Sequence, residues 1–150
     1  MRARVSCATV LMLLAGVMMA RAQTAGELKA RADAAHGGDQ AKLCLEYAWV
    51  ALQNADSLFT AGDVDKAQAK VQEVVAYAQK GVDAASESGK QLKQTEIKLR
   101  KLADRMHDVG ESLAFEDRAP VRQAVNQIQQ MRSDLMVRMW GPQAEPKSKS

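Results

Sequence analysis

The residues with the clearest potential for chemistry lie between positions 104 and 111, where three carboxylates and an imidazole recur at helical spacing. Steps of three and four residues place them on one face of a helix: Asp104, His107, Asp108 and Glu111. Carboxylate and imidazole groups bind divalent cations, so this face is a candidate weak cation site. A solvated face with local ion pairs has the same pattern, and we favour it because the face lies opposite an apolar stripe.

Methionines near His107 form a second pattern that can bind copper or haem. They lie mostly on apolar helical stripes: Met106, Met131, Met136 and Met139. Flexible methionine side chains commonly fill hydrophobic cores. We therefore expect core residues here, and no metal or haem ligands.

Nucleophilic and cofactor chemistry has no further support in the sequence. A serine, threonine or cysteine nucleophile needs a base beside it, and the chain has two histidines, His36 and His107. The motifs Gly-x-Ser-x-Gly, Cys-x-x-Cys-His and Glu-x-x-His are absent, as is a Gly-rich phosphate loop. We therefore expect a non-catalytic protein without catalytic, cofactor-binding or metal-binding residues.

Trp49 is the candidate residue for contact with a partner. Polar residues surround it on its helix: Lys42, Glu46, Gln53, Asp56 and Thr60. A large aromatic residue in the middle of a polar face indicates that something covers it. The cover is either a weakly apolar helix at residues 24–36 or a partner protein, including a second copy of the chain. Trp140, which lies just before Gly141, is expected to pack against the bundle and hold the end of the last helix there.

Basic residues between positions 90 and 105 wrap around their helix without forming one stripe, and no aromatic residue lies among them. Nucleotide bases therefore have no stacking platform, and we expect no nucleic-acid partner. We interpret this region as a solvated face. Weak contact with an anionic envelope polymer or lipid is the alternative.

Residues 1–22 have the organisation of a secretory signal peptide. Arg2 and Arg4 precede an apolar run of about 15 residues, and small residues frame the expected cleavage site at 20–22. The run is too short for a membrane span, so we expect no stable membrane insertion after cleavage. An uncleaved N-terminal anchor is the alternative. Cys7 precedes most of the run, which argues against a lipoprotein.

Removal of residues 1–22 would change the net charge, because three of the 21 basic residues lie there and none of the 18 acidic ones does. The 18 remaining basic residues then balance the 18 acidic ones. The charge is polarised: residues 23–89 contain 10 acidic and 6 basic residues, and residues 90–150 contain 8 and 12. Halves of opposite sign suit a chain that folds back on itself, or one that pairs head to tail with a second copy.

Cys44 is the one cysteine after residue 22, so it cannot form an internal disulfide. Its neighbours on a helix are apolar, which favours a small buried side chain. An intermolecular disulfide is the alternative.

Apolar residues recur at helical spacing through the chain, and good helix formers dominate its composition. The pattern predicts a short first helix and four longer ones: residues 24–36, 40–60, 64–87, about 91–113 and about 121–139. Gly37 is expected to end the first helix, with Asp39 as the cap of the second. Gly62 is expected in the left-handed conformation, with Asp63 as the next cap.

The fourth and fifth helices have their own start signals. Ser88-Gly-Lys-Gln91 has the form of a capping box, which predicts a new helix there. A single long bent helix is the alternative. Asp117 is the expected cap of the last helix, and residues 141–150 are expected to form a disordered tail.

The segment FTAGDVDKAQ at 59–68 resembles the turn of a tetratricopeptide repeat. Gly62 and Asp63 match the turn, and Ala55 and Ala67 stand where that family has small residues that let two helices touch. The resemblance covers one hairpin, about 45–80. Three positions depart from the family pattern: Asn54, Leu58 and Gln79.

Arrays of this family repeat about every 34 residues. One repeat length before and after Gly62 stand Leu28 and Glu96, and neither is a turn residue. We therefore interpret the segment as an isolated helical hairpin and not as part of a peptide-binding array.

The expected fold is all-α: an antiparallel four-helix bundle of long helices with a short extra N-terminal helix, in one domain at 23–140. The pattern resembles small exported helical proteins of the bacterial envelope. We expect an exported, periplasmic interaction or scaffold module whose unknown protein partner, or second copy, contacts Trp49. The alternative is a periplasmic metal-binding or chaperone-like stress protein. LKQTE at 92–96 does not match the Leu-Thr-x-x-Gln motif of helical stress chaperones, which lowers that alternative.

Overall fold

The computed structural model describes residues 24–141, and helices account for nearly all of this part of the chain. An N-terminal helix at residues 24–34 precedes four longer ones: α2 (Gly37–Thr60), α3 (Val64–Ser88), α4 (Leu92–Ser112) and α5 (Arg118–Trp140). A 3₁₀ turn, η1 (Phe115–Asp117), leads into α5. Residues 24–141 contain no strand, so the predicted all-α class is confirmed. The expected signal peptide at 1–22 lies outside the described residues, as does the expected tail after residue 141.

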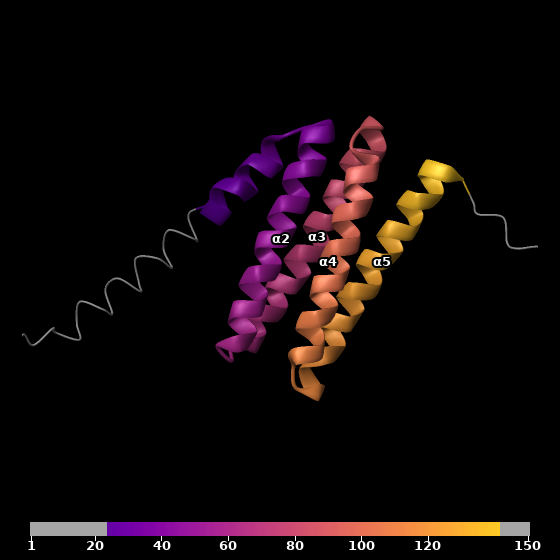
Figure 1. Cartoon of the computed structure of the whole chain (residues 1–150). Helices are drawn as coiled ribbons and strands as arrows, with labels where there is room; N and C mark the ends of the chain where they lie inside the picture. Colours follow the sequence, from indigo (N-terminus) through magenta and orange to yellow (C-terminus); the bar gives the residue numbers. More distant parts are fainter. Residues whose placement is uncertain (1–23, 142–150) are drawn as a thin grey trace, which may run out of the picture.

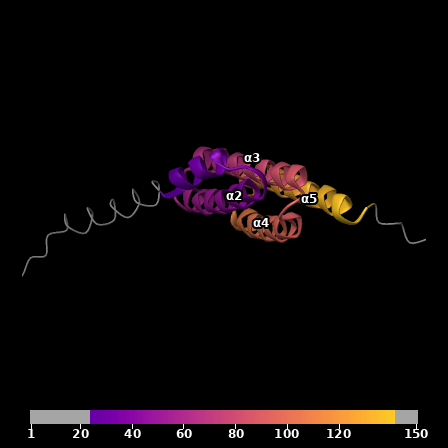
Figure 2. The same ribbon diagram turned by 90° about the horizontal axis from the view of Figure 1, so that it is seen from above.

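Helices α2 to α5 run alongside one another, and consecutive helices point in opposite directions (Figure 1). The most extensive contact joins α2 to α3, and the next joins α4 to α5. These two hairpins meet mainly through α3 and α5, whereas α2 and α4 touch much less. Seen from above, α4 lies to one side of the α2–α3 pair (Figure 2). The α2–α4 side is therefore the more open seam between the hairpins.

The apolar stripes predicted from the sequence form one main core. Large side chains from all four long helices are fully buried in it: Leu52, Val71, Val74, Leu99, Leu102, Met106, Ile128 and Leu135. Each such side chain contributes about 1.5–3 kcal/mol through the hydrophobic effect. The N-terminal helix adds a buried Ala32 and a half-buried Leu28. Met106 and Met131 are buried core residues, as the methionine pattern predicted.

Two glycines inside helices mark close approaches that the sequence did not indicate. A Cβ on Gly81 of α3 would lie 3.1 Å from Leu45 Cγ and 3.2 Å from the Ala41 carbonyl oxygen of α2. A Cβ on Gly110 of α4 would lie 3.2 Å from Val121 Cγ1 of α5. The helices within each hairpin therefore approach closely where the side chain is only a hydrogen.

The turn after α2 has the predicted left-handed glycine. Gly62 has φ +80°, and its amide donates to the Phe59 carbonyl at 3.0 Å. Asp63 occupies the N-cap position of α3, but its side chain makes no capping hydrogen bond. Its carboxylate accepts instead from Lys66 Nζ at 2.7 Å. The predicted turn and the N-cap position of Asp63 are therefore confirmed, although the cap lacks its side-chain hydrogen bond.

The predicted end of the first helix is also wrong. His36, and not Asp39, is the N-cap of α2, and Gly37 belongs to the first turn of that helix with φ +58°. The physical reason is a tertiary contact between the start of α2 and the turn between α3 and α4. A Cβ on Gly38 would lie 3.1 Å from Lys90 Cβ, so the start of α2 packs directly against the turn between α3 and α4.

The predicted capping box at 88–91 does not form. Ser88 is the last residue of α3, and its hydroxyl donates back to the Ala84 carbonyl at 2.7 Å. Gly89 and Gln91 both adopt left-handed φ values, +66° and +64°. This break separates α3 from α4, so the alternative of one long bent helix is wrong as well. Asp117 is the N-cap of α5 but makes no side-chain capping bond.

Candidate functional site

Trp49 lies at an open groove between α2 and α4. Its side chain is 37% exposed, and the groove has a volume of about 500 Å³. Five apolar residues line it: Leu28, Leu45, Trp49, Val50 and Leu102. Three charged residues complete the lining: Glu46, Lys98 and Lys101. The sequence-predicted contact residue thus lies in an apolar depression with a charged edge.

Three helices contribute to this groove. Leu45 and Leu102 also belong to the main core, so the groove floor is the edge of that core. Trp49 stands one helical turn beyond Leu45 on α2, which brings both side chains to the same face. The N-terminal helix supplies Leu28 but leaves the indole partly exposed. Cover of Trp49 by the first helix is therefore present but incomplete.

A second hollow of about 260 Å³ continues the groove toward the start of α4. Leu45 and Lys98 line both hollows, so the two lie next to each other along the α2–α4 seam. Lys42 and Gln91 lie at the far end of this extension. The combined feature, which we call the Trp49 groove, follows several turns of α2 and α4.

Cationic side chains outnumber carboxylates along the Trp49 groove. Lys98 Nζ lies 3.5 Å from Glu46 Oε1 across the seam. Lys42 and Lys101 make no ion pair or side-chain hydrogen bond with the part of the chain that the structure describes. The groove lining therefore carries three ammonium groups against one carboxylate.

Ion pairs also join the two halves of opposite charge. Arg105 of α4 donates to Asp56 of α2 at 2.7 Å, and Lys98 reaches Glu46 on the same pair of helices. These contacts show opposite charges meeting within one chain. They agree with the interpretation that the chain folds back on itself.

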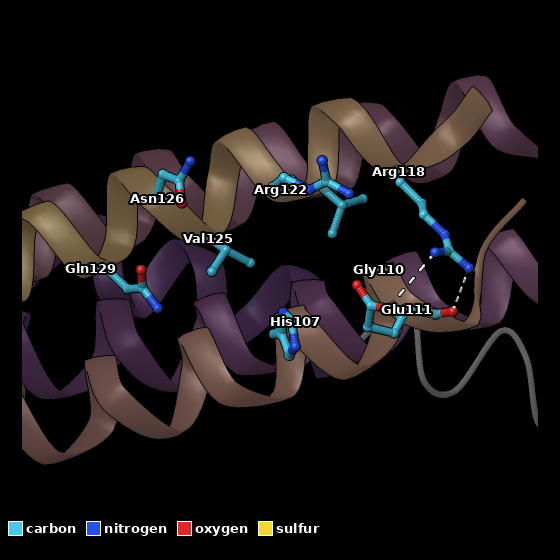
Figure 3. Close-up of a pocket in the computed structure, with 9 residues that line it drawn as sticks. His107, Gly110, Glu111, Arg118, Arg122, Val125, Asn126 and Gln129 are labelled. Atoms are coloured by element: carbon cyan, nitrogen blue, oxygen red, sulfur yellow. Dashed lines mark hydrogen bonds and ion pairs between the residues drawn. The ribbon is translucent and has the colours of Figure 1, made fainter. Parts of the chain in front are cut away.

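The face at 104–111 divides in the structure, and Figure 3 shows the pocket that two of its residues, His107 and Glu111, line. His107 and Glu111 line a pocket of about 260 Å³ between α4 and α5, whereas Asp104 and Asp108 do not. Arg118 reaches across to this face, where its Nη2 donates to the Glu111 carbonyl oxygen at 3.0 Å. Within residues 24–141, no group of three or more His, Cys, Asp or Glu side chains is placed to hold a metal ion. All four residues are exposed, in agreement with a solvated face.

A charged cluster under the N-terminal helix was missed by the sequence analysis. Glu73 Oε1 accepts hydrogen bonds from Lys29 at 2.6 Å and from Tyr47 at 2.8 Å. Its other oxygen accepts from Lys70 at 2.6 Å. Burial raises the pKa of Glu73, but the bonds from Lys29, Lys70 and Tyr47 outweigh burial and lower this pKa to about 2. The carboxylate therefore ties the N-terminal helix to both α2 and α3.

Asp33 extends the same cluster. It accepts from Lys80 at 2.6 Å and from the Tyr77 hydroxyl at 2.8 Å. The Lys80 hydrogen bond is the main cause that lowers the pKa of Asp33. Tyr77 packs edge-on against Tyr47 with ring centroids 4.5 Å apart, and burial is the main cause that raises the pKa of both phenols. Lys29 and its partner Glu73 are 44 residues apart, so no local pattern indicated the cluster.

The structure confirms the prediction for Cys44 and contradicts the one for Trp140. Cys44 is fully buried, and burial raises the pKa of its thiol, as expected for a small core side chain. Trp140 is 64% exposed, so the prediction that it pins the last helix is wrong. The C-terminal end of α5 stands apart from α4 (Figure 1).

Comparison with protein-family models, with curated proteins and with solved structures gives no match to this chain. Among residues 24–141, no helix combines the length and apolar character that crossing a membrane requires.

Proposed function

We propose that this protein is a non-catalytic, exported interaction or scaffold module of the bacterial envelope. In this proposal the four long helices form an antiparallel bundle, with the N-terminal helix as an extra element. The bundle presents the Trp49 groove to a partner protein. The observation that carries the proposal is the partly exposed indole of Trp49 in an apolar, open groove. Aromatic side chains in such depressions are typical anchors of protein–protein contacts.

Two further features support a binding role over catalysis. Cys44 is buried beneath the N-terminal helix, where no substrate reaches it. His107 makes no hydrogen bond to a serine, threonine or cysteine within residues 24–141. Export to the periplasm is supported by the signal-like segment at 1–22. No observation favours the metal-binding or chaperone-like alternative.

Site-specific photo-crosslinking tests the proposal. A benzophenone amino acid replaces Trp49 in the chain expressed in a bacterial periplasm, and a matched variant carries it at Gln72, an exposed position on α3 outside the groove. We expect a discrete adduct from position 49 that is absent from position 72, with the partner identified by mass spectrometry. An adduct of twice the chain mass would identify the partner as a second copy. Equal or absent adducts at both positions would refute the proposed docking surface.

A further inference from the structure

We propose that the occupant of the Trp49 groove is an amphipathic helix of a partner protein, about two to three turns long, with acidic side chains along its edges. This inference rests on the proposed function and assigns the chemistry of the partner.

The length of the groove sets the length of the occupant. It extends from Lys42 to Val50 along α2 and from Gln91 to Leu102 along α4. At 1.5 Å per residue these stretches measure about 12–17 Å, which corresponds to roughly two to three helical turns. A helix of this length places two or three apolar side chains, spaced three and four residues apart, over the groove floor.

The open side of the groove favours a helix over a lipid chain. Sites for small apolar ligands enclose about 70–90% of the ligand surface. Here the floor is apolar, and the groove is open on one side and does not enclose its occupant. A lipid chain would leave much of its surface in water. An amphipathic helix buries one face and keeps its polar face hydrated, which suits an open groove.

Charge complementarity gives the sign of the helix edges. Lys42 and Lys101 lack an ionic partner in the described part of the chain, and Lys98 has only the 3.5 Å contact with Glu46. Acidic side chains on the occupant would pair with these ammonium groups. Such rim charges mainly determine partner choice and association rate.

The same lysines argue against a symmetric dimer through this groove. In a two-fold interface each residue meets the same patch of the second copy. A lining with three ammonium groups against one carboxylate would then meet the same lining, which is unfavourable. A separate acidic helix avoids this repulsion.

Two stapled helical peptides test the inference. Both have about 11 residues, contain no tryptophan and present the same leucine stripe, but one has Glu and the other Lys at the flanking positions. The protein carries Trp140→Phe, so that Trp49 is its only tryptophan. We expect the Glu peptide to shift Trp49 emission to shorter wavelength and to bind about tenfold more tightly than the Lys peptide at low salt.

Charge-swapped variants sharpen the test. Lys98→Glu with Lys101→Glu should invert the preference between the two peptides. Lys90→Glu with Lys93→Glu is the matched control, because these lysines are exposed and do not line the groove, and it should keep the Glu peptide preferred. Circular dichroism confirms that each variant retains its helices.

The remaining outcomes overturn the inference in distinguishable ways. Equal binding of both peptides, or an unchanged preference after the swap, would refute acidic complementarity. Binding of phosphatidylglycerol vesicles without binding of either peptide would identify a lipid occupant instead. If neither peptide binds while crosslinking at Trp49 persists, the helix is wrong and the proposed function stands. If both experiments fail, the proposed function fails as well.

Discussion

Replacement of Glu73 by glutamine should loosen the attachment of the N-terminal helix. The glutamine oxygen can still accept the Tyr47 hydroxyl, so the substitution removes charge while leaving shape and one hydrogen bond. It thereby isolates the two ammonium contacts, from Lys29 and Lys70, both at 2.6 Å. Lys29 lies on the N-terminal helix and Lys70 on α3, so only the Lys29 contact joins different helices.

The expected loss of stability follows from the lowered pKa of the Glu73 carboxylate. The pKa of Glu73 falls from 4.5 to about 2 because the hydrogen bonds outweigh the opposing effect of burial. Lowering the pKa of Glu73 to about 2 corresponds to about 3 kcal/mol of stability at neutral pH. The Glu73 side chain is 18% exposed, so solvent screening reduces this value only in part. We expect Glu73→Gln to lower the free energy of unfolding by about 2–3 kcal/mol at pH 7.

The sign of the pH dependence follows from the depressed pKa. The unfolded chain binds a proton at higher pH than the folded chain does, so the contribution is fully present above about pH 5. It is lost as the pH falls from about 4.5 toward 2. Wild type and variant should therefore differ at pH 7 and converge near pH 2. Asp33 titrates in both proteins, so its contribution cancels in the comparison.

Urea unfolding at pH 7, 5, 3 and 2, followed by circular dichroism, measures this difference. Glu87→Gln is the matched control, because Glu87 is an exposed carboxylate on the same helix without an ionic partner in residues 24–141. The Glu87→Gln substitution should change the free energy of unfolding by no more than about 0.5 kcal/mol. A Glu73→Gln difference below 1 kcal/mol at pH 7, or one that persists undiminished at pH 2, would refute the electrostatic reasoning.

Two further predictions concern the α2–α3 hairpin. Gly81→Ala should lower the free energy of unfolding by about 1–3 kcal/mol, because the new methyl group meets the Ala41 carbonyl oxygen. The matched control is Gly26→Ala, because a Cβ at Gly26 would have nothing within 4 Å. In the same urea assay the control should be neutral or stabilising by up to about 1 kcal/mol. Cys44 should resist a thiol reagent in the folded chain and react in urea, since it is fully buried. Fast labelling of the native thiol, or a dimer band on a non-reducing gel, would contradict its burial.

Helical periodicity was enough to predict most of the fold. The helix predicted over 64–87 is observed at Val64–Ser88, because a regular apolar stripe fixes both the element and its buried face. The start of α2 and the capping bonds at 88–91 were mispredicted for a tertiary reason, whereas the break between α3 and α4 was predicted correctly. Gly38 packs against the α3–α4 turn, and that contact decides which residues begin each helix. Local capping patterns carry no information about such a contact.

Of the residues at the candidate site, only Trp49 could be predicted from the sequence. Trp49 stood out because a large aromatic residue interrupts a polar helix face. Its surroundings come from three helices, and Leu28 and Leu102 are far from it in the sequence. The Glu73 cluster gave no signal at all, since each of its charged residues is ordinary on a helix surface. Side chains separated by more than 40 residues meet only once the helices are packed.

The cluster and the groove are physically linked through the N-terminal helix. On one side of this helix Lys29 bonds to Glu73, and the adjacent residue, Leu28, lines the groove beside Trp49. Neighbouring residues on a helix point about 100° apart, so one short helix can face both the α2–α3 pair and the α2–α4 seam. The apolar anchoring of this helix is thin, because Ala32 is its one fully buried side chain among residues 24–34. Its ion pairs, Lys29 with Glu73 and Lys80 with Asp33, are therefore expected to help hold Leu28 beside Trp49.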